Sequence, residues 1–191
     1  MYEYLTGKIV TLTPTYVVLD NAGIGYFIHI TLHTYGQIQA GVIDTLYIHQ
    51  HIREDAHLLF GFKDEKEREV FRLLMSVPGI GANTARMILS ALNPDELTQA
   101  IANEQVAQLQ GVKGIGAKTA QRLVMELKDK ITRVLPQNLP LSNNTIADEA
   151  LSALVMLGFP KQQAEKALRE IIRQHPQLSV EELVKMALKV L

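Results

Sequence analysis

The chain of 191 residues contains no cysteine and no tryptophan. Without cysteine it can form no disulfide, iron–sulfur cluster or cysteine-ligated zinc site, which fits a reducing compartment. Long apolar runs are also lacking, since none approaches the roughly 18 residues that a membrane span requires. No signal peptide opens the chain, so we expect a cytoplasmic protein of one to three small domains without a membrane partner.

An excess of positive charge is missing as well, because the formal net charge is −1. The charges are unevenly spread along the chain. Residues 1–62 carry 2 basic and 5 acidic side chains, residues 63–135 carry 11 and 9, and residues 146–191 carry 6 of each. Only the middle segment is positive. A polyanionic partner would therefore be bound by locally placed cations and not by a generally basic surface.

The middle segment contains one short pattern twice. Residues 77–85 read VPGIGANTA and residues 112–120 read VKGIGAKTA, 35 residues apart. When the two copies are aligned over 16 positions, 77–92 against 112–127, 8 are identical. In each copy Gly-Ile-Gly precedes an amphipathic helix, expected to begin at Ala82 and at Ala117. Such repetition indicates that the turn does more than join two helices.

The chemistry of the repeated turn favours an anion. Glycine permits positive φ angles and lets the main chain approach another molecule closely. The first N–H groups of the following helix lack internal acceptors and carry the positive end of its dipole, so phosphate is the natural ligand, bound without reading base sequence. We therefore predict a DNA phosphate-binding site, with both isoleucines pointing inward, at Gly79, Ile80, Gly81, Asn83, Thr84, Arg86, Lys113, Gly114, Ile115, Gly116, Lys118, Thr119 and Arg122.

A nucleotide-binding loop is the main alternative for a glycine-rich turn. The Walker pattern fails here because Ala117 separates Gly116 from Lys118 and because no strand precedes the loop. A dinucleotide fingerprint fails because Thr119 stands where a third glycine or an alanine belongs. The sequence thus argues against ATP, NAD and FAD, and we expect no cofactor.

Two adjacent carboxylates, Glu54 and Asp55, lie close in sequence to His49, His51 and His57. Together they raise the alternative of metal-dependent nuclease chemistry. However, no further carboxylate cluster accompanies them and nothing marks an activated nucleophile. We interpret the histidines as exposed strand residues and the carboxylates as solvated surface, and we predict neither a metal site nor a catalytic residue.

The first 62 residues predict an all-β domain. Alternating or β-branched segments at 5–12, 16–20, 25–31, 45–51 and 58–62 are separated by turn signals, which suits a small oligonucleotide-binding (OB) type barrel. From Asp64 the period becomes helical and continues to about Arg133, with a new helix starting at Asn93-Pro94. The segment 135–144, with two prolines and three asparagines, predicts a flexible linker.

Beyond the linker we expect three helices, at 148–157, 161–174 and 180–190, the last with a capping box of Ser179 and Glu182. The predicted fold class is therefore α+β and multidomain. It comprises a barrel at 1–63, a tandem helix-hairpin-helix domain at 64–134, a linker at 135–145 and a three-helix domain at 146–191. The segment Met156-Leu-Gly-Phe159 looks like part of a ubiquitin-associated domain, which leaves a ubiquitin binder as an alternative for the tail.

The whole chain resembles the RuvA family, the Holliday-junction-binding subunits of the bacterial branch-migration machine. The features that carry the resemblance are the opening barrel, the segment REDAHLLFGF at 53–62, the two Gly-Ile-Gly hairpins at family-like spacing and the three-helix tail. The resemblance implies a non-catalytic protein that holds four-way junctions open and square-planar in DNA recombination, repair and the SOS response. It also implies a homotetramer or octamer, with the RuvB ATPase hexamer as partner and the RuvC resolvase as a further candidate.

The resemblance assigns roles to further residues. Glu54 and Asp55 correspond to the family's acidic pin, whose charge would repel phosphates where the arms exchange. Asn83 departs from the family, where lysine is common at this position as at Lys118, and Arg86 one turn later is expected to compensate. The tail would contact the motor through Leu154, Leu157, Ile171 and Leu188.

Two other functions stay open on the sequence. A helix-hairpin-helix glycosylase or nuclease would need a catalytic Asp or Lys after a hairpin, for which Asp129 is a candidate only by default. A generic duplex-binding scaffold would bind phosphate in the same way but would lack the symmetry of a junction binder.

Overall fold

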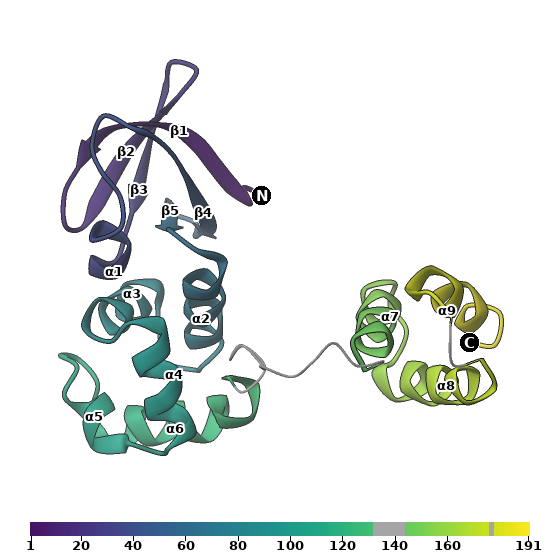
Figure 1. The fold of residues 1–191 in the computed structure, drawn as a ribbon. Helices are drawn as coiled ribbons and strands as arrows, with labels where there is room; N and C mark the ends of the chain where they lie inside the picture. Colours follow the sequence, from purple (N-terminus) through teal and green to yellow (C-terminus); the bar gives the residue numbers. More distant parts are fainter. Residues whose placement is uncertain (132–143, 176–177) are drawn as a thin grey trace. The chain divides into compact units, whose positions relative to one another are not determined.

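The computed structural model describes residues 1–131, 144–175 and 178–191 (Figure 1). The chain divides into two compact units, Met1–Pro136 and Gln137–Leu191. Of the predicted linker, residues 135–143 lie outside the described ones, whereas residues 144 and 145 belong to a helix. Within the described ranges, no helix is both long and apolar enough to cross a membrane.

The N-terminal part of the first unit is a closed barrel, as the sequence predicts. Its strands follow the order β1-β2-β3-β5-β4 and begin and end within two residues of the predicted segments. Neighbouring strands are antiparallel except β3 and β5, which run parallel. Their bounds are β1 (Tyr4–Leu12), β2 (Tyr16–Asn21), β3 (Ile24–His29), β4 (Ile43–Ile52) and β5 (His57–Phe62). Alternate side chains fill the interior with apolar residues, including Ile9, Leu19, Ile28 and Leu46.

The helical part of the first unit is α2 (Glu65–Met75), α3 (Ala82–Ala91), α4 (Pro94–Ala102), α5 (Val106–Gln110) and α6 (Ala117–Ile131). Local chemistry explains where these helices begin. The carboxylate of Asp64 accepts a hydrogen bond from the Glu67 N–H (2.7 Å) and caps α2. Asn93 and Glu96 form a capping box on α4, with Pro94 in the first turn.

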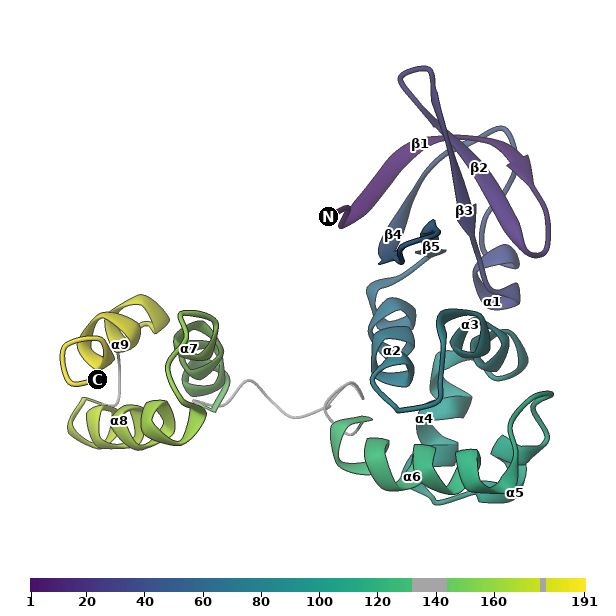
Figure 2. The same cartoon turned by 180° about the vertical axis from the view of Figure 1, so that it is seen from behind.

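The barrel and these helices have separate hydrophobic cores, and Phe60 and Phe62 of β5 join the two parts because they are buried in the core of the helices. Helix α2 lies against β4 and β5, and the short α1 (Leu32–Tyr35), which the sequence did not predict, lies beside α3 (Figures 1 and 2). Phe60 and Phe62 of β5 contact Phe71 of α2, with ring centroids 5.2 and 4.9 Å apart. Aromatic pairs at these distances contribute beyond their buried area. These contacts pack β5 against α2.

The second unit consists of α7 (Asn144–Met156), α8 (Lys161–Gln174) and α9 (Val180–Ala187). The predicted capping box is confirmed, since Ser179 Oγ accepts from the Glu182 N–H and the Glu182 carboxylate accepts from the Ser179 N–H. The helices pack around a small core of Ala150, Leu154, Ala164, Leu168, Ile171, Leu183 and Ala187.

Candidate nucleic-acid interface

The two repeated turns have the same backbone geometry. Gly79 has φ +93° and Gly114 has φ +90°, a region that side chains rarely adopt. In both copies the isoleucine N–H donates to the carbonyl of the valine three positions earlier at 3.0 Å. A second hydrogen bond, of 2.9 Å, runs from the N–H of Ala85 to the Gly81 carbonyl and, in the other copy, from the N–H of Ala120 to the Gly116 carbonyl. The second glycine of each turn does not have a positive φ angle: Gly81, for example, has φ −92° and serves as the N-cap of α3. The positive φ predicted for the turn is thus confined to its first glycine.

Main-chain donors remain available at both turns. Among the described residues we find no acceptor for the N–H groups of the first three residues of α3 or of α6. The N-cap glycine of α3 has no side chain that could bind these groups. Each turn therefore presents several free amides at the positive end of a helix, the arrangement that favours a phosphate.

The two isoleucines lie inside the protein, as predicted. Ile80 and Ile115 are almost fully buried in the core of the first unit, together with Val77 and Val112. They anchor the turns, and any contact that they make with DNA would involve their main-chain atoms. The space outside the turns is open, because a Cβ built on Gly79 or Gly116 meets no atom within 4 Å.

The second hairpin has exposed cations, whereas the first has none at the matching positions. Lys113, Lys118 and Arg122 are exposed, and Arg122 lies 3.9 Å from the carboxylate of Glu126 in a loose ion pair. The matching residues of the first hairpin are the neutral Pro78, Asn83 and Met87. Asn83 is exposed and can donate a hydrogen bond, but it supplies no charge.

Arg86 is directed toward the barrel. Its Nη1 donates to the Thr15 carbonyl (3.0 Å) and lies 3.2 Å from His29 Nδ1. Burial lowers the pKa of Arg86, and burial together with the nearby guanidinium lowers the pKa of His29. The side chain holds α3 against the barrel, so the expected compensation for Asn83 by Arg86 has no support in this geometry.

Arg53 is a residue that the sequence did not single out for DNA binding. Its Nε donates to Nε2 of His51 at 2.9 Å, and its Nη2 lies 4.0 Å from the position of a Cβ on Gly81. The charge of Arg53 therefore lies beside the first hairpin. Because Arg53 precedes Gly81 by 28 positions in the chain, no local sequence pattern connects them, and only the tertiary packing brings the guanidinium to this hairpin.

The acidic pair lies next to Arg53, in the turn between β4 and β5. The Arg53 N–H donates to the Ala56 carbonyl (2.8 Å) and closes this turn. Glu54 and Asp55 are exposed, and neither forms an ion pair with any residue that the structure describes. Two exposed negative charges thus lie in the turn that begins at Arg53.

His49 and His51 are half-buried, so their interpretation as exposed strand residues was wrong, whereas His57 is exposed. The His49 ring packs on Phe71 of α2 with centroids 5.2 Å apart, and it lies 6.3 Å from the His51 ring. Burial, followed by the nearby Arg72, lowers the pKa of His49. These histidines belong to the contact between the barrel and α2.

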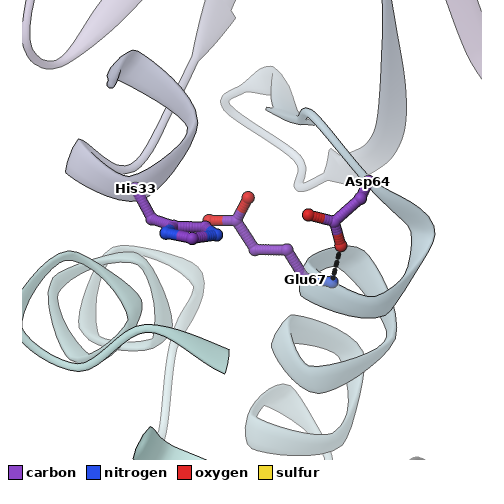
Figure 3. A group of neighbouring side chains, drawn as sticks. All are labelled: His33, Asp64 and Glu67. Atoms are coloured by element: carbon purple, nitrogen blue, oxygen red, sulfur yellow. Dashed lines mark hydrogen bonds between the residues drawn. The ribbon is translucent and has the colours of Figure 1, made fainter. Parts of the chain in front are cut away.

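One group of described side chains has the spacing of metal ligands, and it lies elsewhere. His33, Asp64 and Glu67 bring their ligand atoms within 4.8 Å of one another (Figure 3). The carboxylates already have protein partners: Asp64 caps α2, and Glu67 accepts hydrogen bonds from the hydroxyls of Thr31 and Thr34. Burial raises the pKa of Glu67, and these two hydrogen bonds act in the opposite direction by lowering it. We interpret the group as a polar link between α1 and α2.

Asp129, the candidate for a catalytic carboxylate, lies exposed on α6. It lines an open recess together with Lys128 and Glu104, whose side chains form an ion pair at 2.5 Å. Asp129 itself lies in the last part of α6, whereas the glycine turn precedes the start of that helix at Ala117. Nothing in this arrangement resembles a pocket that would hold an extruded base.

Two of the four side chains predicted to contact the motor are buried within the second unit. Leu154 is fully buried and Ile171 nearly so, whereas Leu157 is 60% and Leu188 44% exposed. The reason is the end of α7, where the Phe159 N–H donates to the Leu154 carbonyl, the Gly158 N–H donates to the Val155 carbonyl, and Gly158 has φ +97°. This Schellman motif turns Leu154 and Phe159 toward the core and leaves Leu157 outside.

Comparison with known proteins matches the chain along most of its length. Family models match residues 1–61 (RuvA N terminal domain), 71–129 (SAM-like helix-hairpin-helix tandem) and 145–191 (RuvA, C-terminal domain). Relatives named Holliday junction branch migration complex subunit RuvA include those of Parabacteroides distasonis, 50% identical over 100% of both chains, and Christiangramia forsetii, 49% identical over 99% of both. The protein of that name from Bacteroides fragilis is 47% identical over 99% of both chains. The chain belongs to the RuvA family.

Proposed function

We propose that the protein binds four-way (Holliday) DNA junctions without sequence preference, as the junction-binding subunit of a branch-migration complex. The observation that carries this proposal is the pair of hairpins with matched backbone geometry, each with free amides at a helix N-terminus. Such donors bind phosphate and read no base edge. The printed names of its relatives supply the junction as the DNA structure to test.

A junction has four arms, so we propose that four copies of the chain surround it, with a second tetramer on the opposite face as an alternative assembly. The barrel supports this proposal because several of its large apolar side chains are exposed and would be covered by contacts between copies. They are Tyr4, Val10, Ile24, Phe27, Ile43 and Ile52.

In such a tetramer the acidic pin would lie near the crossover. Glu54 and Asp55 are exposed and unpaired among the described residues, so their full charge is available to repel phosphates. We propose that this repulsion separates the strands where the arms exchange. The protein itself would catalyse no bond chemistry, because ATP hydrolysis would belong to the motor.

The second unit would recruit that motor, the RuvB ATPase, with the RuvC resolvase as a further partner in the bacterial cytoplasm. Met156, Leu157 and Leu188 support this proposal, because they are exposed apolar side chains that the small core does not use. Leu154 and Ile171 would contribute by holding the unit together.

A competition gel shift at fixed salt tests the proposal. A labelled four-way junction is bound first, and unlabelled junction, linear duplex of equal length and single strand are compared as competitors. We expect the junction to compete best. Equal competition by duplex would show that the protein is a general duplex-binding scaffold. Cleavage of the DNA during the assay would favour the glycosylase or nuclease alternative.

A further inference from the structure

The first hairpin lacks a cation of its own, although its backbone matches that of the second. At the positions of Lys113, Lys118 and Arg122 it has a proline, an asparagine and a methionine. Arg86, the nearest cation in sequence, is bonded to the barrel through Thr15 and His29. Free amides alone would hold a phosphate less tightly than amides with a charged side chain. A cation from elsewhere in the fold would remove this deficit.

Arg53 lies where such a cation is needed. The residue follows β4, and its Nη2 is 4.0 Å from the position of a Cβ on Gly81, the N-cap of α3. The N–H groups of the first turn of α3 have no acceptor in the part of the chain that the structure describes. Side-chain and main-chain donors therefore lie together at one helix end.

This placement is electrostatically unfavourable unless an anion is present. A guanidinium beside a helix N-terminus faces the positive end of the dipole. Glu54 and Asp55 follow Arg53 directly, yet within the described ranges no ion pair forms between them and the guanidinium. A phosphate bound at Gly81 would be held by the amides and by the planar guanidinium, which fits two phosphate oxygens at once.

His51 fixes the direction of the Arg53 side chain. Its Nε2 accepts the hydrogen bond from Arg53 Nε at 2.9 Å, which leaves the outer nitrogens of the guanidinium available. The His51 ring is half-buried and lies near the rings of His49 and Phe60, with centroid distances of 6.3 and 6.5 Å. A ring held in this way loses little freedom when Arg53 engages a ligand.

We propose that Arg53, oriented by His51, is the phosphate-binding cation of the first hairpin, in which Asn83 stands at the position of Lys118 in the second. Arg53 contacts the DNA backbone, and His51 is a positioning residue that acts through it. The proposal rests on the proposed function, because it assumes that the hairpins bind DNA phosphate.

The first test compares the junction affinity of Arg53→Gln with that of Lys8→Gln, which removes the same charge from an exposed side chain. Lys8 pairs with Ile43 at the other end of β4, so it lies roughly 30 Å from Arg53 along the strand at about 3.3 Å per residue. Arg53→Gln should weaken binding at least about tenfold and reduce the slope of log Kd against log salt by about 0.9 for each copy of the chain that contacts the junction, since each copy loses one cation that neutralises a phosphate. Equal effects of the two variants would overturn the proposal.

The second test asks whether a lysine at position 83 can replace Arg53. Adding Asn83→Lys to Arg53→Gln should restore both the affinity and the salt slope, because the charge returns to the same helix end. A double variant as weak as Arg53→Gln alone would contradict the shared role of the two positions.

The role of His51 is separated from a merely structural one by two substitutions. His51→Gln keeps an acceptor for Arg53 Nε, whereas His51→Phe removes it and retains a ring. We expect His51→Phe to lower the affinity and the salt slope, and His51→Gln to retain most of both. Equal slopes in both variants would mean that His51 does not position Arg53.

Failure of this proposal can be told from failure of the proposed function. If the unaltered protein prefers the junction but Arg53→Gln behaves like Lys8→Gln, only the role of Arg53 is refuted. If the unaltered protein shows no preference for the junction over duplex, the proposed function itself fails. Circular dichroism of each variant establishes that it is folded.

Discussion

The two hairpins of the first unit share one backbone and differ in how positive charge reaches them. Gly79 and Gly114 have φ angles within 3° of each other, at +93° and +90°. The second hairpin has exposed cations within its own repeat, whereas the first has a neutral side chain at each matching position. The backbone geometry of a repeat can thus be kept while its electrostatics change.

The first hairpin also depends more on the barrel. Arg86 links α3 to β3, and the Leu32 N–H at the start of α1 donates to Ser90 Oγ of α3 (3.1 Å). Arg53 approaches the same hairpin from the end of β4. We infer that the barrel orients and charges the first hairpin, while the second carries its own charge.

The largest expected effect comes from removing, in the second hairpin, the glycine turn that both hairpins share. Gly114→Val with Gly116→Val should weaken junction binding at least about 100-fold, because one residue is strained at positive φ and the other fills the open space that a phosphate would occupy. A gel shift measures the loss. Gly23→Val is the matched control, since Gly23 also has positive φ (+87°) and an open surround, but lies in the barrel. Unchanged binding by the folded double variant would refute the phosphate-binding assignment.

A smaller effect should distinguish the hairpins by charge. Lys118→Gln should weaken junction binding about tenfold, whereas Asn83→Ala at the matching position should change it about threefold or less, because only lysine contributes a charge-assisted contact. Fluorescence anisotropy at several salt concentrations gives both affinities and slopes. Equal losses would show that the charge difference between the hairpins has no consequence for binding.

Neutralising the acidic pin should strengthen binding slightly. Glu54→Gln with Asp55→Asn removes two negative charges beside Arg53, so junction affinity should stay equal or rise a few-fold, and more at low salt. The same titration measures it. Asp148→Asn with Glu149→Gln is the charge-matched control, because this exposed acidic pair lies in the second unit. Weaker binding by the pin variant would argue against a repulsive pin.

The smallest effect concerns the link between Arg86 and the barrel. Because the pKa of His29 is lowered from its ordinary value of 6.5, the unfolded chain binds a proton that the folded chain excludes. His29 therefore contributes stability above about pH 6.5 that is lost as the pH falls. The free energy of unfolding, measured with urea, should therefore fall more between about pH 7.5 and 5.5 for the unaltered protein than for His29→Gln.

Tyrosine fluorescence is a suitable probe for this measurement. All six tyrosines lie between positions 2 and 47 and the chain has no tryptophan, so the signal reports on the first unit alone. If the free energy of unfolding changes with pH in the same way for both proteins, protonation of His29 does not affect the contact between His29 and Arg86 that holds the first hairpin against the barrel.

Local chemistry made much of the fold predictable. Helix starts at Ala82 and Ala117 follow from the glycine turns, and those after Asn93 and Ser179 follow from capping side chains. Alternating apolar residues predicted the barrel strands. Helix α1 was missed because its four residues are too few to show a helical period.

The electrostatic part of the site was less predictable, because it depends on contacts between distant segments. Nothing near Arg86 in sequence indicates that it would bind Thr15, 71 positions away. The error at Leu154 and Ile171 has a different cause. Ala150 and Leu154, like Ala164, Leu168 and Ile171, follow the spacing of a buried helix face, so the sequence already contained the signal for their burial.

The most direct test of the account is amide hydrogen exchange of the protein with and without a four-way junction. Peptides covering residues 77–86 and 112–121 report on the two hairpins separately. We predict that the junction slows exchange at the first amides of α3 and of α6, because both sets donate to phosphate. Unchanged exchange at both hairpins, with protection elsewhere on a junction-saturated protein, would contradict the claim that these main-chain groups bind the DNA.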